Sequence, residues 1–213
     1  MNTWLHYLLF PFLVLYRFSI IFRNFCYDKN LLKTNQLPCN VISIGNISFG
    51  GTGKTPTVLY LCKMLQESKK KNIAILSRGY KRNTSGTVLV SSGNGPLKNW
   101  QAVGDESYMM AQKTKNIPIV VDSNRYRGGK YLIKNFNSKI IILDDGFQHR
   151  ALSRNLDIVL INGYTKPSDY NFLTTNLIRE TWTSLKRADT IIFTKKNPNP
   201  VSYTHLRAHE TSD

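Results

Sequence analysis

Residues 41–55 constrain the fold of this chain more than any other feature. They read Val-Ile-Ser-Ile-Gly-Asn-Ile-Ser-Phe-Gly-Gly-Thr-Gly-Lys-Thr, which is a short apolar strand, a glycine-rich loop and a Lys-Thr pair that opens a helix. In such a loop the backbone N–H groups bind phosphate oxygens, the lysine reaches the terminal phosphates, and the threonine hydroxyl can ligate Mg²⁺. The motif therefore predicts a site for ATP or GTP.

The loop departs from the strict pattern at one position. A glycine usually stands five residues before the Gly-Lys pair, and Ser48 occupies that position. The remaining glycines still supply the conformational freedom that the loop needs, and the following helix adds a partial positive charge at its N-terminus. A plain glycine-rich turn is the alternative, but Gly-Lys-Thr at a strand-to-helix junction is specific. The predicted phosphate-binding residues are Ser48, Gly50, Gly51, Thr52, Gly53, Lys54 and Thr55.

Apolar runs with β-strand character alternate with helix-periodic segments along the rest of the chain. The strand-like runs are 73–76, 87–90, 117–121, 139–143, 157–161 and 190–194, and the helix-like segments include 104–115 and 126–136. Uninterrupted β-branched runs between helices are typical of a parallel sheet that is covered on both faces. We therefore predict an α/β fold of the P-loop NTPase type over residues 31–200, with a mostly parallel sheet and helices on both faces.

Residues 1–30 are expected to form an apolar, membrane-associated helix ahead of this core. Nearly every residue from 4 to 22 is apolar or aromatic, but the run before Arg17 is shorter than the ~20 residues that span a bilayer. The basic residues follow this run, whereas a signal peptide would begin with them. We predict an interfacial or shallowly inserted helix at the inner face of a membrane, with a buried core helix as the alternative.

The charge balance favours anionic partners. The chain has 29 Lys+Arg against 13 Asp+Glu, a net charge of +16, which attracts phosphates, nucleic acid or an anionic membrane surface. No aromatic and basic pattern for base stacking is visible, so nucleic acid is not an expected partner. Cys26, Cys39 and Cys62 have no paired spacing, which indicates a reducing compartment and no cysteine metal site.

Two acidic pairs could take part in phosphoryl transfer. Asp144 and Asp145 end an apolar strand, where the acid of a nucleotide-binding fold meets the metal ion and its water shell. Asp105 and Glu106 open a predicted helix, a position that also suits a simple interaction with the helix dipole.

Several basic side chains are candidate phosphate ligands. Arg78, Arg125 and Arg127 are suitable because a guanidinium fork matches phosphate oxygens, although each could also be surface charge. His149, just after the second acidic pair, could donate to a phosphate or stabilise a carboxylate, and a purely structural role stays open.

Several sequence blocks together resemble the tetraacyldisaccharide 4'-kinase family. These blocks are residues 45–56, 76–80, 103–106, 124–125 and 143–149, and residues 177–180 are similar to a further family block. The resemblance implies ATP- and Mg²⁺-dependent phosphorylation of the 4'-hydroxyl of a lipid A disaccharide 1-phosphate. It places the protein at the cytoplasmic face of the inner membrane, against an anionic membrane surface, and we expect a monomer.

The resemblance also implies residue roles. Asp105 would take the proton of the sugar hydroxyl, and Arg125 would contact phosphate. The catalytic set is then Asp105, Lys54, Asp145, Arg125 and His149, and the metal set is Thr55, Glu106, Asp144 and Asp145. The main alternative is a partition- or metallochaperone-type P-loop ATPase switch, but that class has a lysine where this chain has Phe49.

The end of the chain is expected to be foreign to the fold. Residues 201–213 follow Asn-Pro-Asn-Pro, continue no strand or helix pattern and resemble translated adapter sequence, so we predict a non-native tail. His205 and His209 are therefore not expected to bind a metal. The family continues into a second, C-terminal domain that carries a histidine thought to pair with the base, so the chain as written is expected to have little or no kinase activity.

Overall fold

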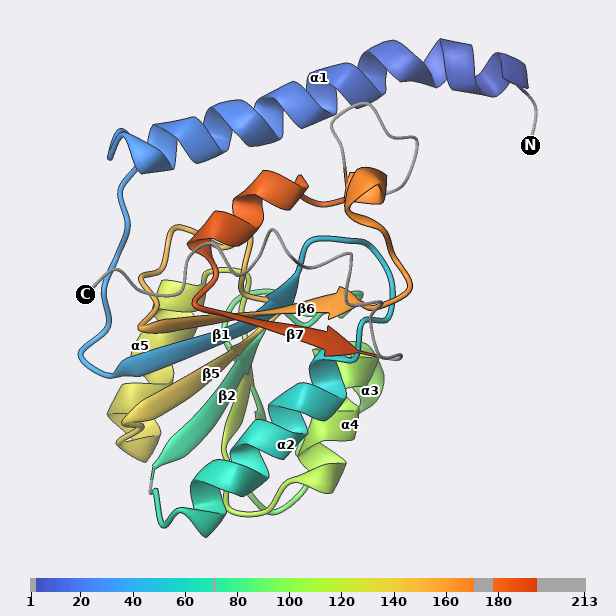
Figure 1. The fold of residues 1–213 in the computed structure, drawn as a ribbon. Helices are drawn as coiled ribbons and strands as arrows, with labels where there is room; N and C mark the ends of the chain where they lie inside the picture. Colours follow the sequence, from blue (N-terminus) through green and yellow to red (C-terminus); the bar gives the residue numbers. More distant parts are fainter. Residues whose placement is uncertain (1–2, 71, 171–177, 195–213) are drawn as a thin grey trace.

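A mostly parallel β-sheet lies at the centre of the structure, a computed structural model that describes residues 3–70, 72–170 and 178–194 (Figure 1). Its strands are β1 (Asn40–Asn46), β2 (Ile73–Ser77), β3 (Val88–Ser91), β4 (Ile119–Val121), β5 (Ile140–Asp144), β6 (Leu156–Asn162) and β7 (Thr190–Thr194). Within these ranges, seven strands lie in the order β3-β4-β2-β5-β1-β6-β7. β3 pairs antiparallel with β4, and the other pairings are parallel, which confirms the predicted sheet.

The parallel register brings the ends of the central strands together. Val41 of β1 lies opposite Ile141 of β5, and the same pairing continues to Ile44 and Asp144. Most side chains of β1 and β5 are apolar and buried on both faces, as a sheet between two layers requires. The glycine-rich loop after β1 and the acidic pair at the end of β5 therefore leave the sheet at the same edge, where α/β proteins bind their ligands.

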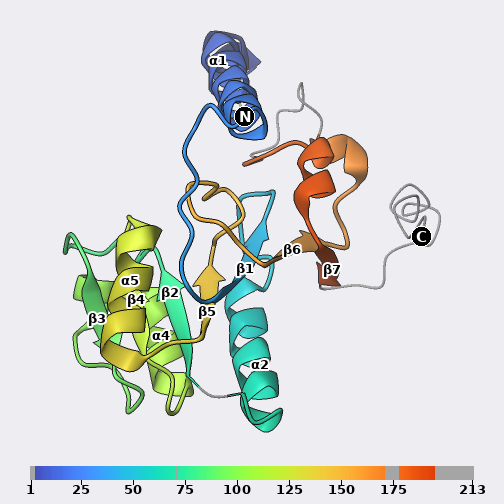
Figure 2. The same ribbon diagram turned by 90° about the vertical axis from the view of Figure 1, so that its left-hand side faces the viewer.

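Helices cover both faces of this sheet (Figure 2). α2 (Lys54–Glu67), α3 (Trp100–Val103) and α4 (Asp105–Lys113) lie on one face, where Val58 and Met110 pack against Ile75 and Ile142. On the other face, α5 (Arg125–Phe136) packs through Leu132 over β2, β4 and β5. The 3₁₀ helices η1 (Pro167–Tyr170) and η2 (Trp182–Arg187) pack in a separate cluster with Val159 and Ile161 of β6. The predicted two-sided helix cover is confirmed.

The long helix α1 (Thr3–Asp28) lies outside these layers, across the ligand-binding end of the sheet (Figure 1). Arg150 attaches its C-terminal end to the core, because NH1 donates to the carbonyl of Asn24 at 2.9 Å and NH2 donates to Asp28 at 2.6 Å. No helix in the described ranges is long and apolar enough to cross a membrane. The predicted tail, residues 201–213, lies outside the described residues.

Candidate active site

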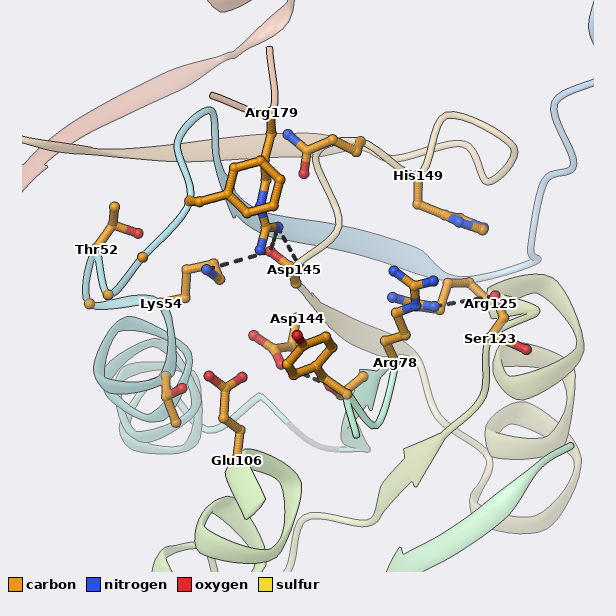
Figure 3. A pocket seen from close by; sticks show the side chains of 18 of the residues that line it. Thr52, Lys54, Arg78, Glu106, Ser123, Arg125, Asp144, Asp145, His149 and Arg179 are labelled. Carbon is orange, nitrogen blue, oxygen red and sulfur yellow. Dashed lines mark hydrogen bonds and ion pairs between the residues drawn. The ribbon is translucent and has the colours of Figure 1, made fainter. Parts of the chain in front are cut away.

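A cleft of about 930 Å³ opens at the carboxyl ends of β1, β2 and β5 (Figure 3). Its lining comes from the glycine-rich loop, the ends of three strands, the first turns of α4 and α5, and one side of α1. The residues are Tyr16, Ser19, Ile20, Arg23, 49–56, Ser77, Arg78, Tyr80, Glu106, Met109, Ser123, Arg125, Asp144, Asp145, Gln148, His149 and Arg179. The cleft thus combines segments from almost the whole described chain.

The glycine-rich loop is attached to β1 and β7 by hydrogen bonds to Thr52. Gly53 caps α2 in a left-handed conformation with φ of 85°, which favours glycine. The hydroxyl of Thr52 accepts from Asn46 at 2.9 Å, and its carbonyl accepts from Thr194 of β7 at 3.0 Å. Predicted residues 50–55 line the cleft, but Ser48 pairs with Ile178 and lines a neighbouring cavity of about 410 Å³.

Asp144 is a buried carboxylate, and one of its oxygens accepts no hydrogen bond from the described residues. Its side chain is almost fully buried, and Oδ2 accepts from Ser77 at 2.8 Å, whereas Oδ1 has no partner among the described residues. Burial raises the pKa of Asp144 to about 6, and the neighbouring charges of Asp145 and Glu106 act in the same direction. A buried carboxylate oxygen without a donor, close to a second carboxylate, is suited to a cation.

Asp145 is shared between two cations. Arg179 NH1 donates to both of its carboxylate oxygens, at 2.5 and 2.7 Å, and Lys54 Nζ lies 3.5 Å from Oδ1. Burial alone would raise the pKa of Asp145, but Arg179 and then Lys54 outweigh this effect and hold it below its usual value. Asp145 therefore stays ionised and keeps both cations near the loop.

A group of basic side chains forms the other half of the cleft (Figure 3). Arg125 is almost fully buried and donates through NH1 to the carbonyls of Asp122 and Ser123, at 3.0 and 3.2 Å. Burial lowers the pKa of Arg125 to about 10, with Arg78 adding to the effect. Burial also lowers the pKa of His149 to about 4, together with the charges of Arg125 and other arginines, so His149 is neutral at pH 7.

Besides Ser48, two further predicted residues do not line the cleft. Asp105, the expected base, is exposed at the start of α4 and accepts from the backbone of Glu106 at 3.0 Å, whereas Glu106 itself lines the cleft. Arg127 does not line it either, because it donates to the buried carboxylate of Asp122 at 2.8 Å through two nitrogens. This pairing gives Arg127 a structural role at the start of α5.

Other cleft residues were not predicted. Arg179, Ser77 and the α1 side chains Tyr16 and Arg23 all line it. Arg179 belongs to the 177–180 block on which the resemblance partly depends, so that block was the available signal. Nothing in the periodicity of α1 marked its cleft-facing side.

The fold and this cleft define a P-loop nucleotide-binding protein of the α/β class. A glycine-rich loop joins β1 to α2, and an acidic pair follows the adjacent strand β5.

The chain belongs to the family described as tetraacyldisaccharide-1-P 4'-kinase, whose sequence model matches residues 5–212. It is 41% identical to the tetraacyldisaccharide 4'-kinase of Aquifex aeolicus over 92% of this chain and 60% of that protein. It is 40% identical to that of Halothermothrix orenii over 85% of this chain and 47% of that protein. The chain therefore spans about half the length of the curated relatives it matches.

A solved structure has the same fold. The crystal structure of LpxK from Aquifex aeolicus, described as an "apo" form in complex with ATP, superposes with a TM-score of 0.81 at 38% identity. The match covers 98% of this chain and 62% of that one. Membership of this family goes against the alternative of a partition- or metallochaperone-type ATPase.

Proposed function

We propose that the complete protein transfers the γ-phosphoryl group of ATP to the 4'-hydroxyl of a lipid A disaccharide 1-phosphate. The observation that carries this proposal is the single cleft in which a phosphate loop, an acidic pair and a group of arginines meet. The related LpxK in complex with ATP supports ATP as the donor. Family membership supports the tetraacylated disaccharide as the acceptor.

The donor triphosphate binds along the glycine-rich loop. Backbone N–H groups of residues 50–55 and the N-terminus of α2 surround its phosphates, and Lys54 leaves Asp145 to reach them. Asp144, Glu106 and Thr55 all line the cleft and are suited to hold Mg²⁺. Asp144 also has a buried oxygen, Oδ1, without a hydrogen-bond partner among the described residues. Asp145 contributes mainly through Lys54 and Arg179. When bound, the ion neutralises charge on the phosphate oxygens.

In the described residues there is no group of three or more His, Cys, Asp or Glu side chains that could hold a metal on its own. In the Mg²⁺ site that we propose, Asp144, Glu106, the Thr55 hydroxyl, waters and phosphate oxygens would share the coordination.

The acceptor hydroxyl approaches from the α1 side of the cleft. Its oxygen forms a bond to the γ-phosphorus, the bond from that phosphorus to the β–γ bridging oxygen breaks, and ADP leaves with the bridging oxygen. Asp105, which the family resemblance implies as the base, would take the hydroxyl proton after its carboxylate turns from the exposed start of α4 toward the cleft beside Glu106. Arg78 and Arg125 stabilise negative charge on the transferred group or on the acceptor's own phosphate.

The proposed location is the cytoplasmic face of the inner membrane. α1 exposes an apolar stripe of Leu15, Phe18, Phe22 and Phe25, at the helical spacing that places side chains on one face. Its other side contributes Tyr16, Ser19 and Arg23 to the cleft. A helix of this kind can lie in a bilayer surface while its polar side reaches the reacting groups. A monomeric state and the absence of a nucleic-acid partner stay predictions.

Radiolabel transfer from γ-labelled ATP to a lipid A disaccharide 1-phosphate tests this function in the product of the complete gene. Asp105→Asn should reduce transfer by about 10²–10⁴-fold, because it removes the proton acceptor. Glu67→Gln is the matched control, since it makes the same chemical change at an exposed carboxylate on α2. Absence of transfer in the parent would contradict the proposed function. Full transfer in Asp105→Asn would contradict the assignment of Asp105 as the base.

A further inference from the structure

The segment that carries Arg179 is attached directly to the root of the phosphate loop. Ile178 forms a bridge with Ser48, and the backbone N–H groups of Arg179 and Glu180 both donate to the carbonyl of Ile47, at 2.8 and 3.1 Å. A displacement of this short segment would therefore move Arg179 relative to Asp145 and the loop.

Glu180 fixes the same segment from its other end. Glu180 is 2% exposed, and its Oε2 accepts from Asn24 of α1 at 3.1 Å and from Arg187 of η2. A carboxylate this deeply buried is stable only when such partners compensate for its lost hydration. Asn24 is thus the contact through which α1 reaches the segment that carries Arg179.

Arg187 extends this contact to the loop after β5. Its guanidinium lies 4.4 Å from the ring centre of Phe147, two residues beyond Asp145. The Glu180 carboxylate therefore connects α1, η2 and the loop that holds Asp145. Arg179 and Asp145 line the cleft, whereas Asn24, Phe147, Glu180 and Arg187 do not.

Arg179 and Lys54 both pair with the carboxylate of Asp145, and Arg179 is the closer of the two. Its nitrogen lies closer to Asp145 than Lys54 does, at 2.5 and 2.7 Å against 3.5 Å. When Lys54 turns toward a phosphate, Arg179 keeps the carboxylate of Asp145 paired. Without Arg179, Lys54 would be the remaining close cation of a partly buried carboxylate, and moving it would leave that charge unpaired.

We propose that Glu180 is a positioning residue that makes the binding of nucleotide phosphates depend on its contact with Asn24 of α1. Asn24 holds Glu180, Glu180 holds the segment of Arg179, and Arg179 frees Lys54 for the phosphates. This inference depends on the nucleotide-binding part of the proposed function, but it does not depend on the identity of the acceptor.

The test is a calorimetric titration of the full chain with MgATP. Asn24→Ala should weaken MgATP affinity by about three- to tenfold, although Asn24 is outside the cleft. Glu180→Gln should weaken it by about tenfold, because Arg187 then lacks its charged partner. If Glu180→Gln does not fold, Asn24→Ala decides alone, since it leaves the pair of Glu180 and Arg187 intact.

Asp28→Asn is the matched control. It loosens α1 at the Arg150 contact without changing Glu180, so its MgATP affinity should stay within about twofold of the parent. A double variant, Asn24→Ala with Arg179→Met, should bind MgATP no more weakly than Arg179→Met alone, because the route from Asn24 acts through Arg179.

Equal losses in Asn24→Ala and Asp28→Asn, or additive losses in the double variant, would overturn the coupling and indicate a general effect of α1 on the fold. Unchanged affinity in Asn24→Ala would also overturn it while leaving the proposed function standing. A parent chain that binds no MgATP would instead remove the proposed nucleotide site, and this inference with it.

Discussion

Arg179 and Asp145 form a closely paired contact between residues that are far apart in the sequence. A single guanidinium nitrogen, NH1, donates to both carboxylate oxygens, at 2.5 and 2.7 Å, while Lys54 stands 3.5 Å away. Asp145 itself adopts a left-handed backbone conformation with φ of 53°, which an aspartate tolerates better than most residues. The pair keeps the pKa of Asp145 below its usual value, so this carboxylate is ionised beside the phosphate loop.

Arg179→Met should weaken MgATP binding by about tenfold, because Lys54 becomes the main cation left for Asp145. Arg179→Lys should retain part of the affinity, since it keeps the charge but not the fork. The free energy of unfolding should change by only about 1 kcal/mol, because the pair is partly exposed and screened. Nucleotide titration and chemical denaturation of the same samples measure both effects. Equal affinity in the parent and Arg179→Met would contradict this prediction.

Asp144→Asn should stabilise the ligand-free protein at neutral pH. Because the pKa of Asp144 is raised from 3.8 to about 6, the folded state binds this proton more tightly than the unfolded state. The contribution of Asp144 to the free energy of unfolding therefore falls as the pH rises from about 4 to 6. The variant should be more stable than the parent by roughly 1–3 kcal/mol at pH 7.5, with a much smaller difference at pH 4. Denaturation at the two pH values measures this, and a pH-independent difference would count against it.

MgATP binding should release a proton from Asp144 near pH 6. A cation beside the open Oδ1 favours the ionised carboxylate, whose pKa in the free protein is about 6. The parent should release about half a proton more than Asp144→Asn at pH 6, and the difference should vanish near pH 8. Calorimetry in buffers of different ionisation enthalpy measures the release. Identical release by the parent and the variant at pH 6 would show that the cation does not meet Asp144.

His149 should remain neutral through the physiological range. Burial and the nearby arginines lower its pKa from 6.5 to about 4, so the unfolded chain binds this proton more readily. The contribution of His149 to the free energy of unfolding rises with pH between about 4 and 6.5, which is opposite to the effect of Asp144. His149→Gln should therefore gain stability relative to the parent as the pH falls from 6.5 to about 4. An NMR titration of the His149 ring with a midpoint near 6.5 would refute this.

Gly45→Ala should destabilise the protein by about 1–3 kcal/mol, because a Cβ would lie 2.5 Å from Cβ of Phe147. Phe147 belongs to the loop after Asp145, so the same change should disturb the acidic pair. Gly51→Ala is the matched control for stability, since nothing lies within 4 Å of its Cβ position and its φ is not positive. Thermal denaturation without ligand compares the two, and equal midpoints would disprove the close approach.

Most of the sheet was predictable from the sequence. The runs at 73–76, 139–143, 157–161 and 190–194 are apolar and β-branched, and each lies within or overlaps an observed strand. Their regularity reflects a simple requirement, since a strand covered on both faces must be apolar throughout. The position of Asp144 at the cleft followed from the same logic, because carboxyl ends of parallel strands share one edge.

The remaining site residues depend on contacts between distant segments. Arg179 reaches Asp145 only because Ile178 pairs with Ser48, and no local pattern encodes that bridge. Glu106 rather than Asp105 faces the cleft because of the phase at which α4 begins, which adjacent acids cannot reveal. The inward side of α1 was hidden by apolar residues such as Ile20, which lines the cleft beside Arg23.

One helix supplies both the apolar stripe and a wall of the cleft. If that stripe rests in a bilayer, the thickness of α1, about 10 Å, sets how far the reacting groups stand above the acyl chains. A sugar head group could then be reached while its tails remain in the leaflet, and a water-soluble analogue without tails would lose the surface that delivers it. In that arrangement, inhibitors that compete with the acylated acceptor would have to partition into lipid first.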